Sequence, residues 1–208
     1  MTERRGPDEA LLVIDIQNDF CEGGALAVPG GDEIVPGVNA LLTRFAARVL
    51  TQDWHPVDHF SFAAQHPGKA PFETVAAPYG EQTLWPAHCV QGGAGAAFHP
   101  DLDTTRADLI VRKGFRREID SYSAFFENDR TTPAGLAGYL RERGIVRLTL
   151  VGLALDYCVR FSAVDAARLG FSVAVRTDLC RAIDMAGSRD AALADMKAHG
   201  VELAEGPA

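Results

Sequence analysis

Short apolar runs alternate with longer stretches of helical periodicity along most of this 208-residue chain. Runs in which nearly every residue is apolar are typical of strands buried on both faces, whereas apolar residues three and four apart are typical of helices. The pattern predicts strands at 11–15, 49–51, 108–112, 146–151, 171–175 and 201–203, and helices at 36–48, 133–143, 156–169 and 188–199. We therefore expect one α/β domain over residues 1–208, a three-layer α/β/α arrangement around a six-stranded, mainly parallel sheet.

The ends of these predicted helices carry the residues that usually mark them. Pro133 stands at an expected first helical position, with Thr131 or Thr132 as the N-cap. Gly170 and Gly200 follow two predicted helices, where glycine commonly ends the last turn. These signals fix the expected boundaries of three helices.

The stretch from Trp54 to Ala107 interrupts the alternation. It is rich in proline, glycine, histidine and aromatic residues, and it has little periodicity. A loop of this length inside a compact domain is usually functional. We therefore expect a long metal- and substrate-binding loop over about residues 53–107.

Four reactive side chains stand at or just after the ends of predicted strands. They are Asp15, Asp53, Lys113 and Cys158. In parallel α/β sheets, ligands bind beyond the carboxyl ends of the strands, where the strand order reverses. We therefore expect these side chains to meet at one edge of the sheet.

Cys158 follows an apolar run that ends in Gly152, at the expected start of a helix. A helix N-terminus favours the thiolate form, which is a strong nucleophile. Asp15 would then be the general base, and Lys113 would keep Asp15 ionised and favour the thiolate. The alternatives stay open: cysteine is often a small buried hydrophobe, Asp15 can cap the next turn, and Lys113 can be a solvated strand-end residue.

A carboxylate and several histidines gather in the long loop. Asp53 and His55 are two residues apart at a strand end, so their side chains share one face, and His59 and His88 follow. A carboxylate with two or three imidazoles is typical of a Zn, Mn or Fe site. The alternative is that these histidines are ordinary surface residues of the loop.

Composition and charge exclude several classes of protein. The net charge of −8 argues against a nucleic-acid partner, and no apolar run approaches the roughly 20 residues of a membrane span. The polar start contains no signal peptide, so we expect a cytoplasmic protein. The four cysteines are widely spaced and are expected to be free thiols. We expect Cys180 to be buried, and Cys21 and Cys89 to lie in loops near the proposed centre at Cys158.

The candidate residues lie in short motifs spread over nearly the whole chain. The motifs are Asp-Ile-Gln-Asn-Asp-Phe at 15–20, Asp-Trp-His-Pro-Val-Asp-His-Phe-Ser at 53–61, Trp-Pro-Ala-His-Cys-Val at 85–90, Lys-Gly at 113–114, Asp-Ser-Tyr-Ser at 120–123 and Gly-Leu-Ala-Leu-Asp-Tyr-Cys-Val at 152–159. In this order they resemble the nicotinamidases of the isochorismatase-like cysteine hydrolase family. True isochorismatases lack the cysteine, and relatives acting on carbamoyl substrates lack the metal motif.

The resemblance implies that family's fold and a role for each candidate residue. Asp15 is the base, Lys113 its cationic partner and Cys158 the nucleophile. Asp53, His55 and His88 hold one divalent metal ion, which is Zn, Fe or Mn. His59 or water is a further ligand.

The resemblance also implies how the substrate is held. The peptide bond between Leu153 and Ala154 is expected to be cis, and the backbone N–H groups of Ala154 and Cys158 are expected to bind the oxyanion. Phe20 and Trp85 match the aromatic walls around a pyridine ring, and Tyr122 closes the pocket.

The implied activity is hydrolysis of nicotinamide to nicotinate and ammonia through a thioester on Cys158, within NAD salvage, with pyrazinamide as a second substrate. Three alternatives stay open: a related amidohydrolase acting on another small amide or N-carbamoyl compound, a metal-hydroxide hydrolase with a structural Cys158, and a metal-binding relative without turnover. The sequence leaves the oligomeric state open, a homo-oligomer included.

Overall fold

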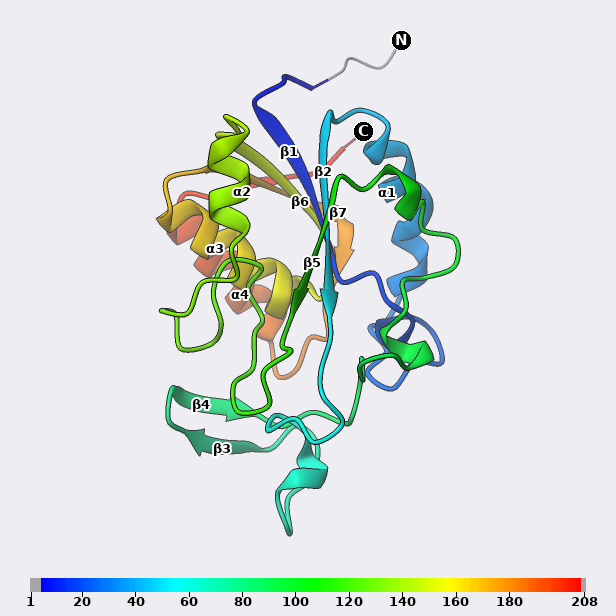
Figure 1. Ribbon diagram of the computed structural model, residues 1–208, viewed down its shortest axis with the longest axis vertical. Helices are drawn as coiled ribbons and strands as arrows, with labels where there is room; N and C mark the ends of the chain where they lie inside the picture. Colours follow the sequence, from blue (N-terminus) through cyan, green and yellow to red (C-terminus); the bar gives the residue numbers. More distant parts are fainter. Residues whose placement is uncertain (1–4, 207–208) are drawn as a thin grey trace.

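The computed structural model describes residues 5–206 and contains a six-stranded sheet in the order β5-β2-β1-β6-β7-β8 (Figure 1). Every strand pairing in this sheet is parallel. The six-stranded α/β prediction is therefore confirmed. The strands are β1 (Glu9–Ile14), β2 (Ala47–Asp53), β5 (Leu109–Lys113), β6 (Arg147–Leu153), β7 (Ser172–Arg181) and β8 (Glu202–Ala204).

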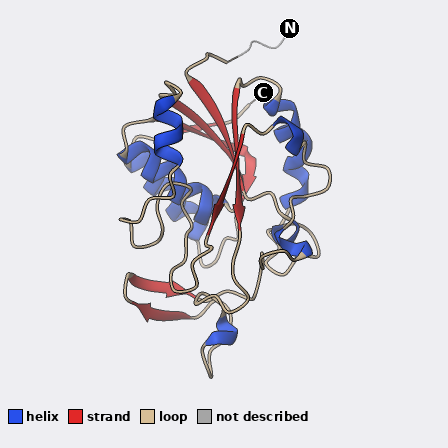
Figure 2. Cartoon of the chain, in the orientation of Figure 1, coloured by secondary structure: helices blue, strands red, loops and turns tan. Residues whose placement is uncertain are grey.

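Helices cover both faces of the sheet, which gives the three expected layers (Figure 2). On β1, Leu11 and Val13 pack into the apolar cluster shared with α1, whereas Leu12 and Ile14 pack into the cluster shared with α2, α3 and α4. Consecutive residues of a strand point to opposite faces, so a strand buried on both sides is apolar throughout. The helices are α1 (Val35–Leu42), α2 (Leu136–Glu142), α3 (Arg160–Arg168) and α4 (Ser188–Ala198).

The helix predicted at 36–48 is shorter in the structure, because α1 ends at Leu42 and β2 begins at Ala47. The hydroxyl of Thr43 donates to the carbonyl of Ala40 at 2.7 Å as the helix unwinds. Phe45 lies beyond the helix but is still buried in the α1 cluster. Its apolar character extended the periodic pattern although the backbone there is not helical.

The predicted N-cap of the helix at 133–143 is also wrong. α2 begins at Leu136, and its N-cap is Gly135. Thr132 instead belongs to the preceding turn, where its hydroxyl donates to Asp129 at 2.6 Å. The predicted helix at 156–169 is divided into a single π-helical turn, η6 (Leu155–Val159), and α3.

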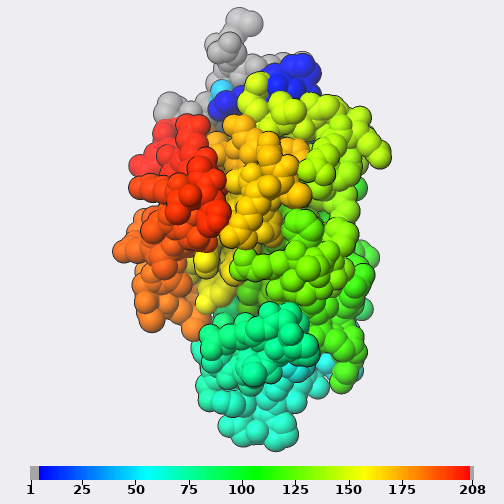
Figure 3. Space-filling view, turned by 90° about the vertical axis from the view of Figure 1, so that its left-hand side faces the viewer, coloured from blue at the N-terminus to red at the C-terminus, as the bar shows by residue number. Residues whose placement is uncertain are grey.

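The long segment after β2 is more regular than expected. It contains a hairpin of β3 (Thr74–Ala77) and β4 (Gly80–Thr83), which the sequence did not predict, and short 3₁₀ turns. The hairpin lies beyond the carboxyl ends of β2 and β5, at the bottom of the molecule in Figures 1 and 3. No helix in the described range is long and apolar enough to cross a membrane.

Candidate active site

The candidate residues meet where the strand order reverses. From β1 the chain continues to β2 and β5 on one side of the sheet, whereas β6, adjacent to β1, continues to β7 and β8 on the other. Asp15 directly follows β1, and Cys158 lies in η6 directly after β6. Asp53 and Lys113 are the paired last residues of β2 and β5. The structure therefore brings these four residues together, as expected.

Lys113 is the centre of the arrangement. Its Nζ lies 2.8 Å from Oδ2 of Asp15 and 3.3 Å from Sγ of Cys158. The same ammonium group donates to Oδ1 of Asp53 and, at 3.1 Å, to the carbonyl of Ser121. Only 1% of Lys113 is exposed. Burial alone would lower its pKa, but the carboxylates of Asp15 and Asp53 outweigh burial and raise it well above the ordinary value.

Asp15 is placed to take a proton. Its Oδ1 accepts a hydrogen bond from the hydroxyl of Thr51 at 2.6 Å, and the residue is fully buried. Its Oδ2 is ion-paired with Lys113 but accepts no hydrogen bond from the described residues. Burial raises the pKa of Asp15 above its ordinary value, although Lys113 opposes the shift. A carboxylate with a raised pKa is a better base than an ordinary aspartate.

The surroundings of Cys158 favour the thiol rather than the expected thiolate. Burial raises the pKa of this thiol well above its ordinary value, Lys113 opposes the shift, and the negative charges of Asp15 and Asp53 add to it. A helix N-terminus was expected to favour the thiolate, but desolvation and two carboxylates outweigh it. A nucleophilic role for Cys158 would therefore require a base that removes its proton during attack.

Asp53 connects the lysine to a cluster of imidazoles. Its Oδ2 lies 3.4 Å from Nε2 of His55 and 3.8 Å from Nε2 of His88. Burial opposes the charge of Asp53, but Lys113 and His55 outweigh burial and hold its pKa well below the ordinary value. One ligand atom from each of the three residues lies within 4.8 Å of the others. This spacing of two imidazole nitrogens and one carboxylate oxygen fits a divalent metal ion.

The backbone orients both imidazoles toward Asp53. Nδ1 of His55 lies 2.8 Å from the carbonyl of Gly114, and Nδ1 of His88 lies 2.9 Å from the carbonyl of Pro86. A ring that donates from Nδ1 leaves Nε2 unprotonated and able to bind a metal. Gly114 has a φ of +65°, and a Cβ there would collide with the ring of His55. The Lys-Gly motif is thus explained by the packing of the cluster.

His59, the further candidate ligand, lies beside this cluster. Its Nδ1 is 2.8 Å from the hydroxyl of Ser61, and its Nε2 is 3.1 Å from the carbonyl of Ile119. It groups with His55 and Asp120 rather than with Asp53 and His88. Both ring nitrogens of His59 therefore have other partners in this structure.

An aromatic pocket opens onto Cys158 and His88. It contains about 320 Å³ of empty space, counting the part open to solvent. Trp85 and Tyr157 meet edge to face with ring centroids 4.9 Å apart, and Tyr122 lies against Tyr157 at 5.5 Å. The three expected pocket residues, Phe20, Trp85 and Tyr122, all line it, together with Leu26, Asp53, His88, Asp120, Ala154, Tyr157, Cys158 and Ile183.

Comparisons with known proteins identify the family. The isochorismatase domain matches residues 9–206. The chain belongs to the isochorismatase family. A nicotinamidase of Acinetobacter baylyi is 55% identical over 193 residues, covering 93% of this chain and 90% of the relative.

Two solved structures of the isochorismatase fold extend this finding. A nicotinamidase and pyrazinamidase of Acinetobacter baumanii matches with a TM-score of 0.96 and 51% identity, covering 97% of this chain and 98% of that one. A pyrazinamidase of Pyrococcus horikoshii in complex with zinc matches with a TM-score of 0.78 and 37% identity, covering 96% and 100%. The likeness therefore extends over nearly the whole of each chain.

Sequence reasoning missed several residues of this isochorismatase-family site. Tyr157 is adjacent to the nucleophile candidate, and Asp120 opens the Asp-Ser-Tyr-Ser motif, so both had a signal. Leu26, Ile183 and Gln82 had none. The cis peptide bond between Leu153 and Ala154, expected from the resemblance, is present.

The other three cysteines do not line the aromatic pocket of this isochorismatase-family chain. Burial raises the pKa of both Cys21 and Cys180 to about 12. Burial also raises the pKa of Cys89 well above its ordinary value. All three are free thiols, and Cys158 alone has an ammonium group at 3.3 Å.

Proposed function

We propose that this chain is a metal-dependent cysteine amidohydrolase that converts nicotinamide to nicotinate and ammonia, a step of pyridine nucleotide salvage. One observation carries the proposal: Lys113 lies 2.8 Å from Asp15 and 3.3 Å from Cys158, and Cys158 lines an aromatic pocket together with His88. The names of the Acinetobacter relatives support this activity.

The pocket suits a flat, neutral, aromatic amide. Phe20 and Trp85 line the same cavity as the thiol, and aromatic side chains favour contact with a pyridine ring. When bound at Asp53, His55 and His88, a divalent ion supplies a Lewis-acidic attachment point for the ring nitrogen, directly or through water. The donor set suits Zn, Fe and Mn alike, and the zinc complex of the Pyrococcus relative makes zinc the first ion to test.

The first half of the reaction forms a thioester. Asp15 removes the proton from Cys158, and the ammonium group of Lys113 stabilises the anionic sulfur. The sulfur attacks the amide carbon, and the backbone N–H groups of Ala154 and Cys158 hold the resulting oxyanion. One such donor typically lowers the barrier by about 3–4 kcal/mol. Asp15 returns its proton to the leaving nitrogen, so ammonia departs and the acyl group stays on sulfur.

The second half regenerates the thiol. Asp15, again a carboxylate, removes a proton from water as the water attacks the thioester carbon. Collapse of this second oxyanion expels the sulfur of Cys158, which takes back the proton from Asp15. The products are the starting enzyme and nicotinic acid, which gives its carboxyl proton to water and leaves as nicotinate. Lys113 keeps its charge throughout, because the carboxylate of Asp53 stays ionised beside it while Asp15 carries a proton.

A coupled ammonia assay on nicotinamide, pyrazinamide and an N-carbamoyl amino acid tests the proposal. We expect ammonia from the first two compounds, and we expect Cys158→Ala to lower the rate by at least about a thousandfold while metal stays bound. Release from the carbamoyl compound alone would favour the other amidohydrolase activity. Full activity in Cys158→Ala would instead favour metal-hydroxide chemistry.

A further inference from the structure

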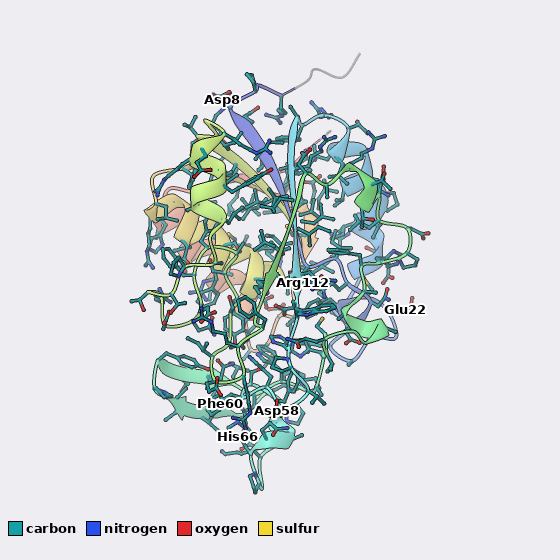
Figure 4. The ribbon with its side chains drawn as sticks, viewed as in Figure 1. Asp8, Glu22, Asp58, Phe60, His66 and Arg112 are labelled. Atoms are coloured by element: carbon teal, nitrogen blue, oxygen red, sulfur yellow. The ribbon has the colours of Figure 1, made fainter. Side chains whose placement is uncertain are left out.

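A second cluster of metal-binding side chains lies outside the active site. Cys21 follows the 3₁₀ turn η1 (Asn18–Phe20), Asp32 lies in the first turn of η2 (Gly31–Ile34), and His99 follows η4 (Ala94–Ala96). One ligand atom from each residue lies within 4.8 Å of the other two. They line a separate pocket that shares no residue with the aromatic one. In Figure 4, the label on the adjacent Glu22 marks this part of the molecule.

The polar atoms of the cluster are already near the spacing of a metal site. Nε2 of His99 lies 3.1 Å from Oδ1 of Asp32. Two ligands bound tetrahedrally to zinc at its usual bond lengths are about 3.3 Å apart. The second oxygen of Asp32 accepts the backbone N–H of Glu22 at 2.8 Å, which fixes the carboxylate. A small shift thus suffices to place an ion between the two side chains.

Cys21 supplies the third donor and closes the inner side of the pocket. The residue is 2% exposed, and within residues 5–206 its sulfur takes part in no hydrogen bond. Asp32 and His99 line the same pocket and are more exposed than Cys21, so an ion that enters the pocket meets them as well as the sulfur. A thiolate, an imidazole and a carboxylate from three segments are a donor set that zinc accepts.

We propose that Cys21, Asp32 and His99 form a second divalent-metal site, suited to Zn²⁺, with water as the fourth ligand. The site is separate from the one at Asp53, and it does not depend on the proposed amidase activity. Two further carboxylates, Asp19 and Glu22, line the same pocket and favour a cation there.

Metal binding at this site releases one proton to solvent. Burial and the charge of Asp32 raise the pKa of Cys21 to about 12, so the free protein holds the thiol and the ion must displace its proton. The imidazole proton of His99 moves from Nε2 to Nδ1. Nδ1 now accepts the backbone N–H of Asp101 at 3.2 Å, and this exposed amide turns to water instead.

An ion at this site would join three segments, one of which borders the aromatic pocket. Phe20, adjacent to Cys21, lies 5.5 Å from the His88 ring, and Leu26, in the same stretch, also lines the aromatic pocket. A bound ion stabilises the folded state in proportion to its affinity. We therefore expect Zn²⁺ to raise the thermal midpoint even when the Asp53 site has been disabled.

Metal titration of the full chain tests the site. The starting protein is metal-free Cys158→Ala, which removes the thiol beside the Asp53 cluster. Titration with Cd²⁺ should produce the ultraviolet thiolate-to-metal charge-transfer band, saturating at one thiolate site per chain, and Zn²⁺ analysis should give two ions per chain. Adding Cys21→Ser should abolish the band and leave one ion. Cys180 is a buried cysteine outside the pocket, so adding Cys180→Ser should change neither the charge-transfer band nor the number of bound ions.

Further variants make the outcome decisive. Asp32→Asn and His99→Gln keep the thiol and should weaken binding of the second ion at least tenfold, even if Cys21→Ser does not fold. Adding His88→Ala should remove the other ion and leave the band, which separates this site from the proposed active-site metal. A single ion per chain that disappears with His88→Ala, or a band that survives Cys21→Ser, would overturn the proposal.

Discussion

Gln82 holds Tyr122 from a hairpin outside the main sheet. Its Nε2 lies 3.0 Å from the phenol oxygen of Tyr122 and 2.8 Å from Oδ2 of Asp120. The indole N–H of Trp85 donates to the same phenol oxygen at 3.1 Å. Gln82 is buried on β4, so the hairpin fixes two residues of the aromatic pocket without lining that pocket itself.

Replacing Gln82 should therefore impair substrate binding more than the chemical step. Gln82→Leu leaves the buried Asp120 carboxylate without one donor, at a cost of about 1.5–3 kcal/mol, and leaves the phenol of Tyr122 held by Trp85 alone of its two donors. We expect KM for nicotinamide to rise about tenfold with a smaller change in kcat, measured in the ammonia assay. Glu81→Gln, on the exposed face of the same strand, is the control. An unchanged KM in Gln82→Leu would show that the hairpin does not position the pocket.

Asp15 is expected to carry the proton transfers. Asp15→Asn keeps the shape and the contact with Thr51 but cannot accept a proton. General bases typically contribute 10²–10⁴-fold, so kcat should fall by roughly that factor. Steady-state kinetics measure the loss, and Asp190→Asn, at an exposed position of α4, is a carboxylate control. A rate within threefold of the parent would remove Asp15 from the mechanism.

The pH profile should follow from the raised pKa of Asp15. A base acts in its deprotonated form, so kcat/KM should fall as pH falls through the pKa of Asp15, at a pH above the ordinary 3.8. Because the pKa of Cys158 is also raised, alkylation of the free enzyme by iodoacetamide should accelerate as pH rises above neutrality. A pH-independent alkylation rate between pH 6 and 9, roughly the range flanking neutrality, would instead indicate a resting thiolate.

The meeting of Asp15, Lys113 and Cys158 could be predicted because it follows from topology. Parallel strands end at one edge of a sheet, and the apolar runs located those ends to within a few residues. The state of the thiol could not be predicted in the same way. It depends on how deeply Cys158 is buried and on two carboxylates of other strands, and neither quantity is present in the local sequence.

The supporting residues of the pocket were also beyond sequence reasoning. Gln82 acts through a hairpin that folds back against Asp120 and Tyr122, residues about forty positions away along the chain. A segment of glycine, proline and polar residues gives no periodic signal for such a contact. The cluster of Cys21, Asp32 and His99 was missed for the same reason, since its members come from three separate loops.

Metal removal should weaken substrate binding while leaving the nucleophile intact. Chelation, verified by metal analysis, is expected to raise KM for nicotinamide, and His88→Ala should do the same because it removes one of the three proposed ligands. His66→Ala is the matched control, since this ring contacts the carbonyl of Phe60 and lies outside the cluster of Asp53, His55 and His88. His66 and Phe60 are both labelled in Figure 4. Unchanged kinetics after complete removal of metal would defeat the metal assignment.

Lys113 should be required for folding stability as well as for activity. Its ammonium group lies between the buried carboxylates of Asp15 and Asp53, so Lys113→Met would leave two negative charges unpaired in the interior. Breaking a buried ion pair typically costs about 3–5 kcal/mol. We expect a loss of that size in the free energy of unfolding, measured by urea denaturation of the metal-free protein.

Lys69→Met provides the comparison, because Lys69 pairs with Glu73 at 3.1 Å on the surface, where such pairs contribute about 0–1 kcal/mol. The triple variant Asp15→Asn, Asp53→Asn, Lys113→Met removes all three charges. It should recover part of the lost stability, since neither carboxylate is then left without its ammonium partner. Equal losses of unfolding free energy in Lys113→Met and Lys69→Met would mean that the charges of Asp15, Asp53 and Lys113 do not stabilise the fold.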